Sequence, residues 1–254
     1  MKKNVLIALV VAFFFTGCMK EKTNNIVGNF NKVLNEYQSK DDSKGSIVLE
    51  FPANPYDEQG KKHNDLLDRF FKEVYEKVEP SLYLETFFEM SGVQWQEKPE
   101  YYVDLMKKIS TELYDKEGYN PALVNENKYF STFEKEILNA YFTKMFCLEK
   151  AEEKVELSKK AEEFILHEKE ISKEERRRIL TSFAIFRYSS SFWAPFLIKE
   201  EPAMRSICST LDAIGYWLAR NTDVCPNCQD GKDLYAYAAG YSFSVGIALG
   251  VWCY

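Results

Sequence analysis

Helical spacing of apolar residues runs through most of the chain and is the feature that most restricts its fold. Between residues 57 and 78 the apolar positions recur every three or four residues, so they share one helix face. They are Leu66, Leu67, Phe70, Phe71, Val74 and Val78. Further helical stretches are expected at about 81–90, from Pro99 to Gly118, at about 201–220 and at about 232–253. Only Ile47–Phe51 has the composition of a strand, so the sequence predicts an all-α fold, a single compact domain of six to eight helices.

Two capping boxes mark helix starts in the second half of the chain. Ser131-Thr132-Phe133-Glu134 predicts the start of one long helix that continues to about Phe164. Ser172-Lys173-Glu174-Glu175 predicts a helix over 173–193, which Pro195 limits. Glycines that follow periodic stretches, such as Gly92, predict helix ends.

The last 21 residues, Leu234 to Tyr254, carry no charge. Small residues recur at every fourth position in this segment, at Ala236, Gly240, Ser244 and Ala248. Such a face lets another helix approach closely, in lipid or in a tight protein core. We expect a glycine- and alanine-rich apolar C-terminal helix packed centrally in the domain. A transmembrane helix and a helix that inserts conditionally are the alternatives.

The first residues resemble a bacterial export signal. Lys2 and Lys3 precede an uncharged apolar run from Val5 to Phe15, which is too short to span a bilayer. Phe15-Thr16-Gly17-Cys18 follows and resembles the lipobox of bacterial lipoproteins, although Phe15 stands where that pattern usually has an aliphatic residue. The resemblance implies cleavage before Cys18 and acylation of its thiol, with palmitate as the expected lipid. It places the mature protein in the cell envelope.

Three regions are expected from these signals. Residues 1–17 form a cleaved signal peptide, 18–53 a lipid-anchored tether with one short strand, and 54–254 the helical domain. A short apolar periodicity from Ile26 to Tyr37 allows a loose helix within the tether. The formal charge is −6, and removal of residues 1–17 makes it −8. An acidic domain gains nothing from a phosphate backbone, so no nucleic-acid partner is expected.

Cys225-Pro226-Asn227-Cys228 is the one cysteine motif with chemical interest. It lies in a polar turn between two expected helices, without the preceding strand that redox CxxC motifs have. A structural disulfide between Cys225 and Cys228 is the leading interpretation in an oxidising compartment. Free thiols, zinc and redox catalysis are the alternatives. Zinc needs four ligands, and no second motif supplies them, so no metal and no cofactor is predicted.

The chain has only two histidines, His63 and His167. A hydrolase would need a nucleophile beside a base, and the weak candidates are His63, Asn64 and Ser190. No Gly-x-Ser-x-Gly elbow supports them. No catalytic residue is therefore assigned from the sequence.

A wider resemblance covers most of 54–254. Asn54-Pro55-Tyr56 and His63-Asn64 come early, and Ser190-Ser191-Phe192-Trp193 comes later, before a glycine-spaced apolar C-terminus. This order resembles a group of uncharacterised exported bacterial proteins. The resemblance implies no activity, but it implies that His63, Asn64 and Trp193 meet in space.

Together these features predict a lipid-anchored protein of the cell envelope with a non-catalytic binding or assembly role. Its partners are the membrane, through the lipid, and an unidentified envelope protein or ligand. A helical envelope hydrolase that uses His63 with a nearby serine is the first alternative. A membrane-inserting protein that acts through its C-terminal helix is the second.

Overall fold

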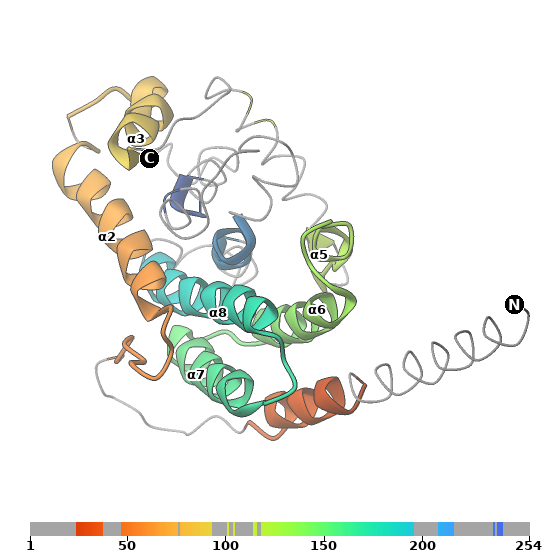
Figure 1. The fold of residues 1–254 in the computed structure, drawn as a ribbon. Coiled ribbons are helices and arrows are strands. Elements are labelled where there is room, and N and C mark those ends of the chain that lie inside the picture. The colour runs from red at the N-terminus through yellow and green to blue at the C-terminus, as the bar shows by residue number, and fades with distance from the viewer. Residues whose placement is uncertain are drawn as a thin grey trace, which may run out of the picture.

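The structure is a computed structural model that describes residues 24–37, 47–75, 77–92, 101, 104, 114–115, 118–195, 208–215, 236 and 238–240. The described part forms one all-α domain, as predicted (Figure 1). The named elements are α2 (Asp57–Glu73), the 3-10 turn η1 (Pro80–Leu82), α3 (Tyr83–Ser91), α5 (Ala122–Asn125), α6 (Thr132–Phe146), α7 (Ala151–His167) and α8 (Lys173–Trp193). Helices also cover 24–35 and 208–215. A minimal hairpin pairs β1 (Tyr114–Asp115) with β2 (Gly118–Tyr119).

Helix α8 lies at the centre of the domain, with α2 and α7 packed along it (Figure 1). Every residue from Ile179 to Ser190 is buried, on all sides of the helix. A helix buried on every face has neighbours all around it. This arrangement explains why α8 supplies more of the polar groups described below than any other helix.

Aromatic rings hold the other helices to α8. The Tyr141 ring of α6 stacks on Phe183 with centroids 3.9 Å apart. Phe30 lies 6.0 Å from Phe183 and 5.5 Å from Phe164 of α7. Rings of this size bury large apolar areas and dominate the core energy. One aromatic cluster therefore joins α6, α7, α8 and helix 24–35.

Helix 24–35 corrects the predicted domain boundary. Ile26, Phe30 and Leu34 recur every fourth residue and are all buried in the core. Residues 24–37 are therefore part of the helical domain, which begins well before residue 54. The apolar spacing was visible in the sequence, but the many asparagines around it favoured a tether.

The expected strand at Ile47–Phe51 is also wrong, because residues 47–50 have no regular structure. Side chains bind their carbonyl groups in place of a neighbouring strand. Lys159 Nζ donates to the Val48 carbonyl at 2.5 Å, and Arg187 donates to that of Leu49. A lone strand in a helical domain has no second strand to bond with, so side chains of α7 and α8 donate hydrogen bonds to its backbone carbonyl groups.

Several predicted helix ends agree with the structure. Asp57 starts α2, and Gly92 ends α3 with a φ of +69°, a conformation that favours glycine. Trp193 ends α8, as the nearby proline predicts.

Three predictions of helical extent are wrong. α2 ends at Glu73, although the apolar spacing continues to Val78. The segment expected to be helical up to Gly118 contains β1 at Tyr114–Asp115, paired with β2 at Gly118–Tyr119. The long helix expected after Ser131 is two helices, α6 and α7, separated by residues 147–150. No glycine or proline marks that break.

The two capping boxes are present and bound to each other. Glu134 and Glu175 each accept from the backbone N–H of their own cap residue, Ser131 and Ser172. The Ser131 hydroxyl also donates to Glu175 Oε1 at 2.6 Å. Arg178 donates to both carboxylate oxygens of Glu134. The first turns of α6 and α8 are thereby joined.

A glycine allows α2 to approach α8 closely. A Cβ built on Gly60 would lie 2.5 Å from the Tyr188 ring and 2.7 Å from the Ala184 carbonyl oxygen. Backbone atoms cannot move aside cheaply, so this crossing requires glycine. The close approach brings the side chains of α2 within reach of those of α8.

Most of the C-terminal segment lies outside the described residues. Ala236, Ala238, Ala239 and Gly240 are described; they are helical and buried, which agrees with central packing. None of the described helices is long and apolar enough to cross a bilayer.

Candidate functional site

Three helices bring polar side chains together inside the domain. Asp212, from helix 208–215, accepts at Oδ2 from the Ser189 hydroxyl at 2.5 Å and the Trp193 indole at 3.1 Å. His63 of α2 places Nε2 3.1 Å from the same oxygen. All four side chains are 0% exposed. We call His63, Ser189, Trp193 and Asp212 the Asp212 cluster.

The Asn64 side chain orients the His63 ring. Asn64 Nδ2 donates to the Tyr188 carbonyl, so its Oδ1 is the acceptor that faces His63 Nδ1 at 3.0 Å. His63 Nδ1 must then carry a hydrogen. Its Nε2 faces a carboxylate oxygen as a charge contact rather than an aligned hydrogen bond. His63 Nε2 and Asp212 Oδ2 thus face each other inside the core, with both side chains fully buried.

The structure brings together some of the predicted residues. His63 and Trp193 meet at Asp212, and Asn64 orients the His63 ring. Ser190 does not take part, because its buried hydroxyl has no hydrogen-bond partner among the described residues. The neighbouring Ser189 contacts the carboxylate instead.

Asp212 was missed by the sequence analysis, although a signal for it exists. It is the only charged residue between Arg205 and Arg220. A lone charge in an apolar helix is costly to bury unless partners compensate it. That position alone could have predicted a buried partner for His63.

The geometry of the cluster differs from that of a hydrolase. In a working triad the histidine lies between the serine and the acid and takes the serine proton. Here Ser189 donates directly to Asp212, and His63 contacts the acid from another side. With no exposed atoms, the cluster offers no surface to a substrate. Its contacts are those of a polar network that fixes α2, α8 and helix 208–215 together.

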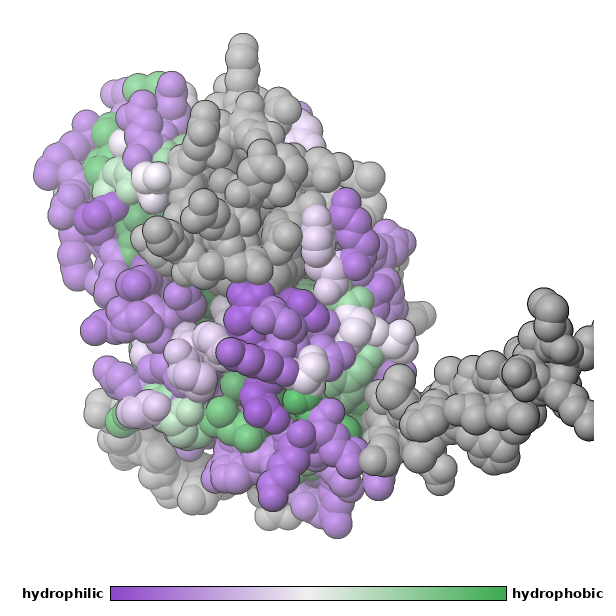
Figure 2. Space-filling view, viewed as in Figure 1, coloured by the Kyte–Doolittle hydropathy of each residue, from purple (hydrophilic) through white to green (hydrophobic). Residues whose placement is uncertain are grey.

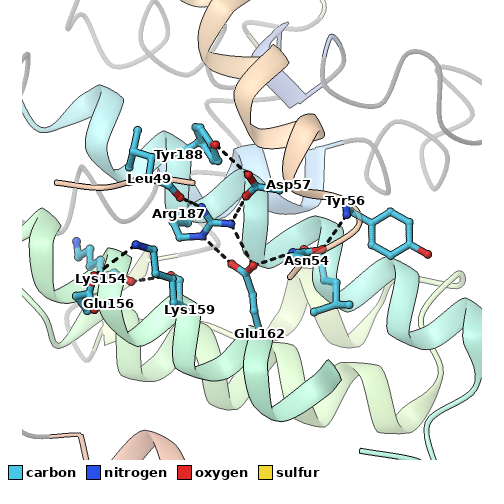
Figure 3. A network of polar contacts seen from close by, with 12 residues as sticks. Leu49, Asn54, Tyr56, Asp57, Lys154, Glu156, Lys159, Glu162, Arg187 and Tyr188 are labelled. Carbon is cyan, nitrogen blue, oxygen red and sulfur yellow. Dashed lines mark hydrogen bonds and ion pairs between the residues drawn. The ribbon is translucent and has the colours of Figure 1, made fainter. Parts of the chain in front are cut away.

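A second network surrounds Arg187 of α8 (Figure 3). Arg187 donates to both oxygens of Glu162, at 2.8 and 3.1 Å, and to Asp57 Oδ1 at 2.5 Å. It also donates to the Leu49 carbonyl. The Tyr188 hydroxyl donates to the other oxygen of Asp57 at 3.2 Å. One guanidinium therefore binds two carboxylates from different helices.

Asn54 extends this network to the segment before α2 (Figure 3). Its Nδ2 donates to Glu162 Oε2 at 2.7 Å and to the Leu180 carbonyl at 3.1 Å. Its Oδ1 accepts from the Tyr56 backbone N–H at 2.9 Å. Asn54 thereby fixes the start of α2 against both α7 and α8, which gives the Asn-Pro-Tyr sequence a structural role.

Burial and neighbouring charges shift the pKa values of Glu162 and Arg187 in opposite directions. Burial raises the pKa of Glu162, and Arg187 and Asn54 only partly oppose it, so the pKa stays raised. Burial alone would lower the pKa of Arg187, but Glu162 and Asp57 outweigh it and raise the pKa overall. Arg187 therefore remains charged at every physiological pH, as a fixed clamp.

An open groove of about 440 Å³ lies between helix 24–35 and α7. Its lining combines apolar and charged side chains, namely Val33, Lys160, Glu163, Phe164, His167 and Glu168. Lys160 also lies over the Tyr37 ring, 4.9 Å from its centroid. Figure 2 shows that the described surface on the face in view is largely hydrophilic, with smaller hydrophobic patches.

The described cysteines form no disulfide, and the described residues form no cluster of metal ligands. Cys147 is exposed and Cys208 is buried, and both are free thiols. The predicted disulfide between Cys225 and Cys228 lies outside the described residues. Among the residues that the structure describes, no three His, Cys, Asp or Glu side chains gather as metal ligands would.

Comparison of the chain with family models, curated proteins and solved structures finds no match.

Proposed function

We propose that this protein is lipid-anchored in the cell envelope and has a non-catalytic binding or assembly role. The observation that carries the proposal is the complete burial of the Asp212 cluster. His63, the candidate base, is fully buried there in contacts that hold three helices together. What remains for function in the described part is the outer surface.

The anchor rests on the lipobox resemblance at Phe15-Thr16-Gly17-Cys18. Each buried methylene of an acyl chain adds about 0.8 kcal/mol of membrane affinity, and stable anchoring takes more than one chain. Acylation of Cys18 by two or three chains would keep the domain on the membrane. A rigid helical domain held there is suited to present a binding surface.

The groove between helix 24–35 and α7 is a place on the described surface where a ligand or a peptide can bind. It has apolar contact from Val33 and Phe164, and charges of both signs around them. Binding sites commonly combine an apolar floor with a few polar groups that fix orientation. A partner bound there would meet the acidic Glu163 and Glu168 as well as the basic Lys160.

Cross-linking of the lipoprotein in its own cells, followed by pull-down and mass spectrometry, tests the proposal. The wild type should recover a partner at near-equal abundance. Glu163→Lys, in the groove, should lower that recovery several-fold. The matched change Glu85→Lys on the exposed side of α3 should not. Recovery of the bait alone, from wild-type cells, contradicts an assembly role.

A further inference from the structure

We infer that the exposed face of helix 24–35 lies against the headgroup layer of the membrane, with α3 pointing away from it. The inference rests on the proposed acylation of Cys18 and adds the orientation of the domain. It follows from three features: the fixed position of this helix, the short chain before it, and its lack of net charge.

Helix 24–35 is a rigid part of the domain. Phe30 is fully buried, and its ring contacts those of Phe164 and Phe183. Ile26 and Leu34, one turn before and after it, are buried as well. A helix held by its whole apolar face moves with the domain, so its position relative to the membrane sets that of the domain.

The chain between the anchor and this helix is short. Asn24 follows Cys18 by six residues, which reach at most about 20 Å when fully extended. A domain of this length has a radius of gyration of about 18 Å and is therefore roughly 45 Å across. The start of helix 24–35 cannot rise from the membrane by even half that width. The side that carries it must face the bilayer.

The outer face of helix 24–35 has the chemistry that this position requires. Its exposed residues are mainly asparagines, Asn24, Asn25, Asn29 and Asn35. Lys32 and Glu36 pair across one turn, 3.7 Å apart, and cancel in charge. The mature chain as a whole is acidic and would be repelled by anionic lipids. A neutral amide surface avoids that repulsion and can hydrogen-bond to headgroups.

Figure 1 shows α3 at the opposite end of the domain from helix 24–35, beyond α2 and α8. With helix 24–35 at the membrane, α3 is the part of the described domain that extends farthest from it. The groove beside α7 then opens close to the bilayer surface, so its partner would be bound at the membrane rather than above it.

Paramagnetic broadening tests this orientation. The isotope-labelled, acylated mature protein, which begins at Cys18, is bound to bilayer discs in which a fraction of the lipid headgroups carries chelated gadolinium. Amide signals of 24–35 should lose intensity several-fold more than those of α3 (83–91). Insertion of a long Gly/Ser segment between Lys20 and Asn24 should remove the difference, because the longer chain frees the orientation.

The outcomes separate the two proposals. Equal broadening of 24–35 and α3 in disc-bound wild type overturns the orientation and leaves the anchor in place. Stronger broadening of α3 overturns it as well. Failure of the protein to bind the discs at all contradicts the proposed anchor itself.

Discussion

Asp212→Ala is expected to destabilise the domain strongly, because the Asp212 carboxylate joins three helices. The change removes the acceptor that Ser189 and Trp193 share and the carboxylate oxygen that His63 Nε2 faces. Ser189 retains only a longer contact, 3.3 Å, to the Ser209 hydroxyl. His63 keeps Asn64 on one side and loses its charged neighbour on the other.

The size of the effect follows from these contacts. Each lost buried hydrogen bond costs about 1 kcal/mol, and charged partners cost more. Loss of the shared acceptor leaves the buried Ser189 and Trp193 donors without their carboxylate, at about 1–3 kcal/mol each. Domains have a free energy of unfolding of about 5–15 kcal/mol, so the variant should lose a large fraction of it. For a domain of this size the melting temperature should fall by about 10 °C.

Urea unfolding followed by circular dichroism measures this change in a Cys18→Ser background, which avoids the lipid. Asp65→Ala, on the exposed side of α2, is the matched control and should leave stability almost unchanged. Active sites often store instability, and their replacement can leave stability equal or higher. An Asp212→Ala variant as stable as wild type would therefore refute the structural reading of the cluster.

Four further changes test other contacts by the same unfolding assay. Gly60→Ala should destabilise by about 1–3 kcal/mol because the new Cβ meets the Ala184 backbone. Gly28→Ala, with open space around the new Cβ, should stabilise by up to about 1 kcal/mol. Equal effects of the two changes would contradict the close crossing of α2 and α8. Arg187→Met should cost about 3–5 kcal/mol of stability by leaving Glu162 buried without its charged partner. A loss no larger than that of the exposed control Lys72→Met would refute the role of Arg187 in holding the helices together. Ser131→Ala should cost about 1 kcal/mol from the lost cap and more than Ser172→Ala, since the Ser131 bond to Glu175 joins α6 to α8, whereas the Ser172 bond to Glu175 stays within the first turn of α8. The reverse order would argue against the link between the two helices. Burial raises the pKa of Glu175, but hydrogen bonds from Ser131 and Ser172 outweigh it and lower the pKa overall. The ionised carboxylate therefore stabilises the fold at neutral pH, and this stabilisation is lost as the pH falls below 4.5, the ordinary pKa of the group. Glu175→Gln should make the free energy of unfolding depend less on pH in that range, and an unchanged pH profile would contradict this.

Local signals in the sequence predicted the parts of the fold that depend on a few neighbouring residues. Ser131 and Ser172 each lie three residues before a glutamate, and both capping boxes formed. Gly92 ended α3 because only a residue without a side chain easily adopts its positive φ. Their outcome depends little on the rest of the chain.

Features set by tertiary packing were not predicted. The break at 147–150 has no glycine or proline, and packing of α7 on α8 outweighs the continuous apolar pattern. Ile47–Phe51 has strand composition, yet Lys159 and Arg187 take up its carbonyl groups from distant helices. Side-chain partners more than a hundred residues away leave no local trace.

The candidate site was predicted in part for the same reason. His63 and Trp193 both contact Asp212, and Asn64 contacts His63. That these three residues would meet was expected only from a resemblance, and no local signal in the sequence predicts it. The choice of Ser190 over Ser189 depends on which side of α8 faces helix 208–215, and adjacent residues on a helix differ by about 100°. Asp212 lies in a largely apolar segment that was considered only as a helix of the core, so the acid that joins the cluster was not predicted.

Mass spectrometry of the N-terminal peptide, from protein purified out of its own cells, tests the central claim most directly. A membrane-bound protein that begins at Cys18, with diacylglycerol on its thiol, is the predicted result. A Cys18→Ser variant should lose that modification and leave the membrane fraction. A mature protein whose Cys18 carries no lipid, or one that retains residues 1–17, would contradict the anchored envelope role and the orientation derived from it.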